Sequence, residues 1–212
     1  MTGDHYFSAD PASPGERFPL RVRLAGLDLE LASAPGVFSG DRLDPGTAVL
    51  LDHVPPPPSG ELLDLGCGWG PVALTMGLLS PQARVWAVDV NRRALDLTRL
   101  NAEAVESRHA LATVLPCPPD DVPADLRFDA LWSNPPIRIG KEALHGLLAA
   151  WVPRLVPGGE AHLVVQKNLG ADSLARWLAD QAADGAPWGE VERVASSRGY
   201  RVLRVRRPEA GS

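Results

Sequence analysis

The pattern of apolar and polar positions changes near residue 60. Before it, residues 18–31 alternate on either side of Ala25-Gly26, which predicts a β-hairpin. A short helix is expected over 47–54. The run Pro55-Pro-Pro-Pro-Ser-Gly60 cannot continue this helix, because proline lacks the amide hydrogen that a helix uses. We therefore expect an N-terminal extension over 1–54, a proline-rich linker over 55–60 and a main domain over 61–212.

After residue 60, short apolar runs of strand length alternate with amphipathic stretches of helix length. Strands are expected at 62–65, 84–89, 110–115, 128–133, 161–166, 191–195 and 200–206. Helices are expected at 71–79, 92–106, 141–155 and 173–183. This alternation predicts an α/β fold of the Rossmann-like kind, with a mostly parallel sheet of seven strands and helices on both faces. The last two strands are expected to form an antiparallel edge hairpin.

The composition is that of an ordinary globular protein, with 45% hydrophobic and 22% charged residues in 212. No apolar stretch approaches the roughly 18 residues of a membrane helix, and residues 1–17 lack an apolar run typical of a signal peptide. A cytoplasmic protein with no membrane partner is therefore expected. The two cysteines, Cys67 and Cys117, are expected to be reduced thiols, and neither lies in a metal-binding spacing. The net charge of −5 does not favour nucleic-acid binding, so contact with RNA would need a local basic patch or a partner.

A glycine-rich segment, Asp64-Leu-Gly-Cys-Gly-Trp-Gly70, lies between the first strand and the first helix of the predicted sheet. Nucleoside cofactors bind at this position in such folds, because glycines allow the backbone to turn tightly and approach the ligand. The fingerprint of nicotinamide-binding proteins would place a third glycine where this chain has Pro71. Asp89 ends the next strand, where a carboxylate can accept both ribose hydroxyls, and Asn91 adds a further contact. The alternative is a plain turn, with Asp89 capping a helix.

The sequence Ser133-Asn-Pro-Pro-Ile137 follows the fourth strand. The side-chain oxygen of Asn134 and the carbonyl of Pro135 can each accept an N–H from an amine, which leaves the nitrogen lone pair directed outward. Pro135 and Pro136 fix their own φ angles and stiffen this segment. The pattern indicates a site that orients a weakly nucleophilic amine. The alternative is a proline-rich loop in which Asn134 is a turn residue.

Together these motifs resemble the methyltransferase small-domain family, and in particular the guanine-N2 methyltransferases of small-subunit ribosomal RNA. The matching segments are His5-Tyr-Phe-Ser8, Gly36-Val-Phe-Ser39, Leu43-Asp-Pro-Gly-Thr47, Asp64–Gly70, Asp89-Val-Asn91, Asn134–Ile137, Gly140-Lys141 and Gly199-Tyr-Arg201. The resemblance implies a class I methyltransferase fold, S-adenosylmethionine (AdoMet) as the cofactor, and RNA methylated on guanine N2 as the substrate.

The resemblance also implies roles for individual residues. Asn134, Pro135 and Pro136 would be catalytic. The segment over 38–47 would close over the cofactor. The residues expected to bind the cofactor are Phe38, Thr47, Asp64, Gly66, Cys67, Gly68, Gly70, Asp89, Val90, Asn91 and Asn134. Ile137, Arg138 and Lys141 would contact the substrate, and no metal is expected.

The chain departs from this family in two respects. Many bacterial relatives carry a second, N-terminal copy of the domain. Many base-modifying relatives have an aromatic residue at the position of Ile137, where it stacks on the base, so Phe7 or Phe38 would have to replace it. Two alternative functions therefore stay open, a methyltransferase for a protein amide or small amine and a non-catalytic AdoMet-binding module. The sequence does not distinguish a monomer from a dimer.

Three further groups of residues have two interpretations each. Arg138 and Lys141 are interpreted either as contacts to an RNA phosphate or as ordinary solvated charges. The C-terminal arginines suit either an RNA-binding patch or the protection of an edge strand, and they are Arg198, Arg201, Arg204, Arg206 and Arg207. His145 and His162 lie within a predicted helix and strand, where a structural role is expected.

Overall fold

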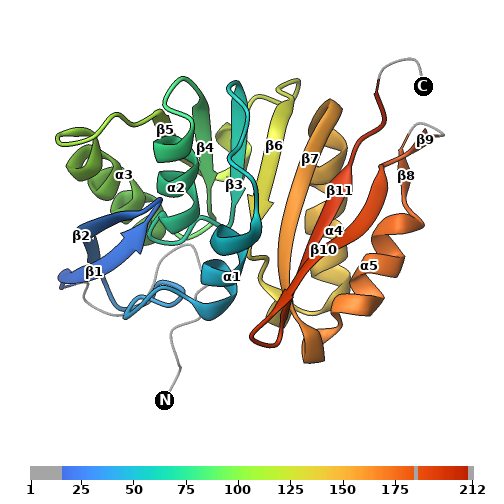
Figure 1. The fold of residues 1–212 in the computed structure, drawn as a ribbon, viewed down its shortest axis with the longest axis horizontal. Helices are drawn as coiled ribbons and strands as arrows, with labels where there is room; N and C mark the ends of the chain where they lie inside the picture. The colour runs from blue at the N-terminus through green and yellow to red at the C-terminus, as the bar shows by residue number, and fades with distance from the viewer. Residues whose placement is uncertain (1–15, 184–185, 210–212) are drawn as a thin grey trace. The chain divides into compact units, whose positions relative to one another are not determined.

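The computed structural model describes residues 16–183 and 186–209 (Figure 1). These residues form two compact units, one containing 16–44 and 56–124 and the other 45–55 and the described residues from 125 onward. The motif His5-Tyr-Phe-Ser8, with the proposed stacking residue Phe7, lies outside the described residues. The division into an extension, a linker and a main domain stays a prediction.

The first unit begins with the predicted hairpin, β1 (Phe18–Leu24) paired antiparallel with β2 (Leu27–Ser33). Its two turn residues both have positive φ, 48° at Ala25 and 80° at Gly26, as a two-residue hairpin turn requires. The side chain of Asn101 accepts the Ala32 N–H at 2.7 Å and donates to the Ala32 carbonyl at 2.9 Å. Asn101 therefore ties the hairpin to a helix far along the chain.

The rest of the first unit contains three parallel strands, β3 (Glu61–Leu65), β4 (Arg84–Val88) and β5 (Thr113–Cys117). It also contains two helices, α2 (Pro71–Leu79) and α3 (Arg92–Glu106). A short 3-10 turn, η1 (Pro119–Asp121), follows β5. The strand predicted at 110–115 begins later, at Thr113. The reason is that the preceding residues pack on α2, where the Ala112 N–H donates to the Gly77 carbonyl at 3.1 Å.

The second unit holds the strands β6 (Phe128–Ser133), β7 (Leu155–Gln166), β10 (Glu190–Ser197) and β11 (Tyr200–Arg206). β6 pairs parallel with β7, whereas β11 pairs antiparallel with both β7 and β10. The helix α1 (Pro45–His53) packs on β7 and β11. The remaining elements are α4 (Lys141–Trp151), α5 (Ala171–Ala179), the short strands β8 (Ala182–Ala183) and β9 (Ala186–Pro187), and the 3-10 turns η2 (Ile137–Ile139), η3 (Val152–Arg154) and η4 (Lys167–Leu169).

Three elements in the second unit differ from the prediction by more than two residues at one end. The helix expected to reach residue 155 ends at Trp151, because Pro153 cannot continue it and the chain tightens into η3. The strand expected from 161 begins at Leu155, and Pro157-Gly-Gly159 forms an irregularity within β7 rather than a turn before it. The helix expected over 173–183 spans 171–179 instead, because a short β-ladder takes its last residues.

The seven-stranded sheet has the strand order β10-β11-β7-β6-β3-β4-β5. The predicted fold class is therefore confirmed, a mostly parallel α/β sheet with an antiparallel C-terminal edge and an N-terminal β-hairpin. Within the part of the chain that the structure describes, no helix is both long and apolar enough to span a membrane.

Candidate active site

The glycine-rich segment turns sharply between β3 and α2. Gly66, Gly68 and Gly70 all have positive φ, at 84°, 57° and 95°, a region that L side chains seldom occupy. The Gly66 and Cys67 N–H groups donate to the Val88 carbonyl at 2.8 and 3.0 Å, which fixes the start of the loop against the end of β4. A Cβ added at Gly66 would meet no atom within 4 Å. At Gly66 the loop therefore presents bare backbone to open space, directly after the carboxyl end of β3.

Asp89 is half-buried directly after β4 and holds the same loop. Its carboxylate accepts the Gly68 N–H at 2.9 Å through Oδ2 and the Asn91 N–H at 2.9 Å through Oδ1. Burial raises the pKa of Asp89, and hydrogen bonds from the backbone of Asn91, Gly68 and Val90 oppose this rise. The sequence expectation that Asp89 and the glycine loop lie together is met. Val90 beside it is 46% exposed, so an apolar side chain lies open next to the carboxylate.

Asn91 is buried and makes contacts of two kinds. Its side-chain oxygen accepts the Arg93 and Ala94 N–H groups at 3.0 and 3.4 Å, so Asn91 caps α3. Its side-chain nitrogen donates to the Gly36 carbonyl at 2.8 Å. The helix-capping role that the sequence left open for Asp89 therefore belongs to Asn91, whose further contact reaches the Gly36–Ser39 segment.

The Gly36–Ser39 segment is tied to the glycine loop as well. The indole N–H of Trp69, whose side chain is buried, donates to the Ser39 carbonyl at 3.2 Å. Phe38 lies within this segment and is 43% exposed. Part of the segment expected to close over the cofactor thus lies beside the loop within the first unit. Thr47, also assigned to the cofactor, belongs to the second unit.

Asp64 gives the first unit its most strongly perturbed carboxyl group. The side chain is 1% exposed and accepts the Ala73 N–H at 2.9 Å, near the start of α2. Burial, with a smaller contribution from the charge of Asp89, raises the pKa of Asp64 to about 8 against the lowering effect of the Ala73 hydrogen bond. The charge of Asp89 disfavours ionisation of Asp64, and a ligand that carries positive charge would offset this repulsion. AdoMet has such a charge on its sulfonium and amino groups, so the residues present fit this cofactor.

Two residues that the sequence reasoning did not assign also shape the loop. The Thr98 hydroxyl donates to the Gly68 carbonyl at 2.9 Å, and Asn101 donates to the Trp69 carbonyl at 2.9 Å. Both lie on the buried stripe of α3. The sequence contained a signal for these contacts, since Thr98 and Asn101 are polar residues on the otherwise apolar stripe of an amphipathic helix. Buried polar groups of this kind need hydrogen-bond partners.

The Asn-Pro-Pro motif lies in the second unit, where β6 ends. The side-chain nitrogen of Asn134 donates to the hydroxyl of Thr47 at 3.0 Å, and Thr47 lies buried in α1. This contact sets which way the amide of Asn134 is turned. The Pro135 carbonyl accepts the Ile137 N–H at 2.8 Å, directly before η2. A carbonyl has two lone pairs, so Pro135 can accept a second N–H.

Of the three residues predicted to contact the substrate, two line a pocket and the third does not. Ile137 and Lys141 line one pocket of about 150 Å³ together with Leu144, His145, Val165, Leu169, Gly170, Ser173 and Leu174. Arg138 is exposed and is not among the residues lining this pocket. All of the lining residues belong to the second unit. Most of this lining is apolar, and His145 is the only ring among the residues that surround it.

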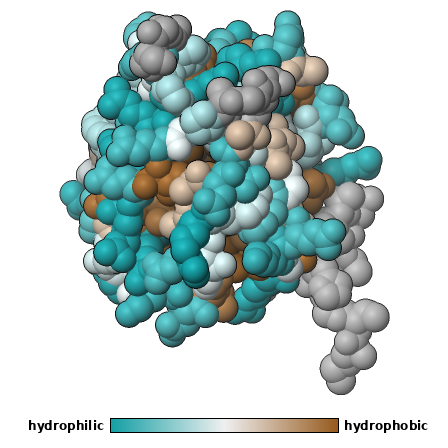
Figure 2. Space-filling model, turned by 90° about the vertical axis from the view of Figure 1, so that its right-hand side faces the viewer, coloured by the Kyte–Doolittle hydropathy of each residue, from teal (hydrophilic) through white to brown (hydrophobic). Residues whose placement is uncertain are grey.

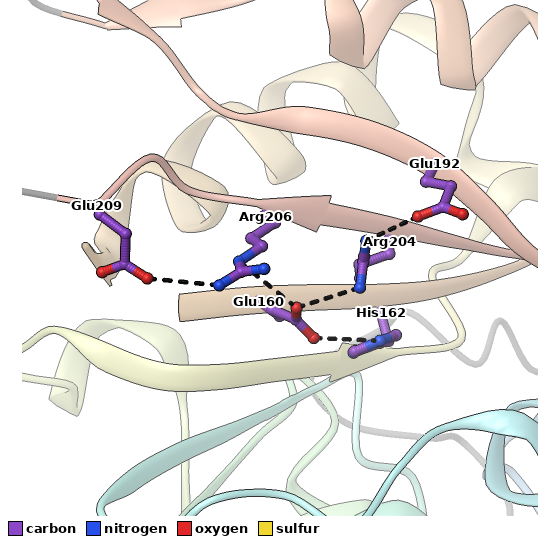
Figure 3. Close-up of polar contacts among 6 residues, drawn as sticks. All are labelled: Glu160, His162, Glu192, Arg204, Arg206 and Glu209. Carbon is purple, nitrogen blue, oxygen red and sulfur yellow. Dashed lines mark hydrogen bonds and ion pairs between the residues drawn. The ribbon is translucent and has the colours of Figure 1, made fainter. Parts of the chain in front are cut away.

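The C-terminal arginines have partners within the second unit. Arg204 contacts Glu192 at 2.7 Å and Glu160 at 3.4 Å, and Arg206 contacts Glu209 at 3.4 Å (Figure 3). Arg198 pairs with Asp52, Arg201 with Asp172, and Arg207 donates to the carbonyls of Pro153 and Leu155. These contacts favour the interpretation of the cluster as a structural edge over that of an RNA-binding patch.

His162 lies beneath this cluster on β7 and is buried. Its Nε2 is 3.7 Å from Glu160 (Figure 3). Burial, together with the charge of Arg204, lowers the pKa of His162 to about 4. The ring is therefore neutral near pH 7 and its contact with Glu160 is not an ion pair, which agrees with the expected structural role.

Comparison with known proteins places the chain in a family. The methyltransferase small domain family matches residues 28–204. The chain is 30% identical over 208 residues to the uncharacterized protein YbxB of Bacillus subtilis (strain 168), covering 96% of this chain and 98% of that protein. It is 36% identical over 214 residues to the ribosomal RNA small subunit methyltransferase C of Pseudomonas entomophila (strain L48), covering 98% of this chain and 59% of that protein. The chain thus spans about three fifths of the length of this methyltransferase.

The fold agrees with a solved structure. The T. thermophilus 16S rRNA N2 methyltransferase RsmC, in complex with AdoMet and guanosine, superimposes with a TM-score of 0.69 at 22% identity. The match covers 92% of this chain and 51% of that one. The predicted resemblance is confirmed, and the chain belongs to the methyltransferase small-domain family, with the class I fold and the AdoMet dependence of that family.

Proposed function

We propose that this protein methylates guanine N2 in small-subunit ribosomal RNA or another structured RNA. The observation that carries this proposal is the Asn134-Pro-Pro motif at the end of β6, with the amide of Asn134 oriented by Thr47. Support for RNA comes from relatives, since a protein 36% identical is named a small-subunit ribosomal RNA methyltransferase. Such a substrate would place the protein in the cytoplasm.

Residues of the first unit would hold AdoMet, which supplies an electrophilic methyl group on its sulfonium. The Asp89 carboxylate would accept the ribose hydroxyls, while Val90 would pack on the adenine and Phe38 would cover it. The loop of Gly66, Cys67, Gly68 and Gly70 would give its backbone to the rest of the cofactor. Asp64 would hold the start of α2 beside it, and Asn91 would hold the Gly36–Ser39 segment. Thr47 and Asn134 of the second unit complete the predicted set.

The second unit would prepare the nitrogen. The guanine N2 amino group is conjugated to its ring and is a poor nucleophile. Because the side-chain nitrogen of Asn134 is engaged by Thr47, its oxygen is the atom that would accept one N–H of the amine, and the Pro135 carbonyl would accept the other. Pro136 would keep this segment rigid. The nitrogen lone pair would form the new N–C bond as the S–C bond breaks, and the nitrogen proton would then leave to water.

A second candidate is a methyltransferase for a protein amide or a small amine. Two observations favour it, namely Ile137 in place of an aromatic residue and the acidic net charge of −5. The internal pairing of the C-terminal arginines points the same way, because these charges are already engaged. In both candidates Asn134 would have the same role, so the two differ only in the substrate.

The test is methyl transfer from labelled AdoMet to undermodified small ribosomal subunits and, in parallel, to naked RNA and cell protein. We expect label in RNA, recovered as N2-methylguanosine after digestion, and lost in Asn134→Ala but not in the matched surface control Asn168→Ala. Label in protein instead would support the second candidate. AdoMet binding without transfer to any of these substrates would indicate a non-catalytic binding module.

A further inference from the structure

The pocket beside the Asn-Pro-Pro motif contains a ring that the sequence reasoning set aside as structural. His145 lies on α4, lines this pocket and is half-buried. Its imidazole stacks on the indole of Trp177 from α5, with ring centroids 3.7 Å apart and an angle of 16° between the planes. Trp177 in turn packs edge-on against Trp188 at 5.5 Å. The imidazole is therefore held in place by two tryptophans while part of it borders the pocket.

The other pocket residues define what could occupy it. Its walls are mostly aliphatic, and Lys141 brings a positive charge one helical turn before His145, on the same face of α4. A cavity of roughly 150 Å³ with aliphatic walls can hold a flat ring of the size of benzene, which corresponds to one of the two fused rings of a purine. A flat ring next to a cation matches a nucleotide, whose base is planar and whose phosphate is negative. Burial and the charge of Lys141 also lower the pKa of His145.

Ile137 connects this pocket with the acceptor motif. It directly follows Asn134-Pro-Pro, at the position where base-modifying relatives have a stacking aromatic residue, and it lines the same pocket as His145. Apolar residues gather near the middle of the side of the molecule on which α5 lies in Figure 1, with hydrophilic residues around them (Figure 2). The ring that borders the pocket beside Ile137 therefore comes from α4.

We propose that this pocket holds the acceptor base of the RNA and that His145, supported by Trp177, stacks on the base in place of the aromatic residue absent at 137. This inference rests on the proposed function and names the residue that would position its substrate. His145 is a substrate-binding residue in this account, since bond formation takes place at the nitrogen held by Asn134. Lys141 would contact the phosphate of the same nucleotide.

The test uses the fluorescent nucleotide 2-aminopurine riboside monophosphate, a purine with the same amino position as guanine, whose emission is quenched when it stacks. Quenching is measured with the wild type, His145→Ala, His145→Phe and the control His109→Ala, a histidine of the first unit. We expect His145→Ala to weaken probe binding by about 5- to 150-fold, the usual loss for one stacked base, and His145→Phe to retain it. The double variant Ile137→Phe/His145→Ala should recover binding, because it restores a ring in the pocket.

The same variants are then compared in methyl transfer to undermodified small subunits. A stacking contact present before and during the reaction should raise KM for RNA more than it lowers kcat. If His145→Ala proves unstable, His145→Leu keeps the bulk without the aromatic face and is used in its place.

The outcomes separate the two proposals. Probe binding and KM that are unchanged in His145→Ala, while RNA is methylated, would overturn the role of His145 and leave the proposed function standing. Probe binding that depends on His145, without methylation of RNA, would support the purine pocket and overturn the choice of RNA as substrate.

Discussion

Replacing Asp64 with asparagine tests how burial controls the charge of the glycine loop. Asp64→Asn keeps an oxygen that can accept the Ala73 N–H, which lies 2.9 Å from the carboxylate, and removes the ionisable group. Burial raises the pKa of Asp64 from 3.8 to about 8. Between these two values the folded protein holds a proton that the unfolded chain has lost.

The sign and size of the effect follow from this difference. Because the folded pKa is the higher one, the contribution of Asp64 to stability is complete below pH 3.8 and is lost as the pH rises toward about 8. When the folded state holds one proton more than the unfolded state, a rise of two pH units lowers the free energy of unfolding by about 2–3 kcal/mol. Asp64→Asn lacks this loss, so its stability relative to the wild type should rise by about 2–3 kcal/mol between about pH 5 and about pH 7.

Urea unfolding of the cofactor-free protein at several pH values measures this quantity. His162, whose pKa is lowered to about 4, gives the wild type an opposite pH dependence, but it is present in both proteins and cancels in their difference. The exposed Asp41→Asn variant serves as the control and should run parallel to the wild type. Parallel curves for Asp64→Asn as well would refute the reasoning, since Asp64 would then be ionised in the folded protein throughout this range.

Three further substitutions and one matched control test separate parts of the structure. Asp89→Ala removes the acceptor of the Gly68 N–H together with the proposed ribose contact, so AdoMet binding in calorimetry should weaken by about 10- to 100-fold; unchanged affinity would exclude Asp89 from the site. Asn134→Ala should lower turnover about 100-fold or more while AdoMet affinity stays nearly constant, because its main contact would be with the amine of the substrate, and a parallel loss of affinity would contradict this. Gly199→Ala forces a side chain into φ +82° and should lower the free energy of unfolding by about 1–2 kcal/mol in thermal unfolding. The control Gly146→Ala, within α4, should instead raise the free energy of unfolding by up to about 1 kcal/mol. Equal effects of the two substitutions would show that the positive φ is not the cause.

The elements that sequence reasoning predicted correctly are those governed by local pattern. The hairpin of β1 and β2 follows from alternation around Ala25-Gly26, and α2 and α3 have the bounds that their apolar spacing predicts. The grouping of Asp89 with the glycine loop was predictable too, because parallel strands bring their carboxyl ends to one edge of the sheet.

The features that were missed depend on residues far apart in the sequence. Thr98 contacts Gly68 over 30 positions, and Asn101 contacts Ala32 over 69. The stacking of His145 on Trp177 needs α4 and α5 side by side, which no local pattern specifies. The irregularity of β7 at Pro157-Gly-Gly159 is of the same kind, because a proline followed by two glycines normally predicts a turn. The roles assigned to the site residues stay predictions until the variants are measured.

The place of α1 in the chain has a consequence for synthesis on the ribosome. α1 leaves the ribosome early, between segments of the first unit, yet it packs on β7 and β11, and β7 begins only at Leu155. Chains fold from the N-terminus as they emerge, so the first unit can assemble while α1 still lacks its partners. Val49 and Leu50, fully buried in the finished protein, are then open to a chaperone. Because Thr47 lies on this helix, the contact that orients Asn134 is among the last parts of the nascent protein to form.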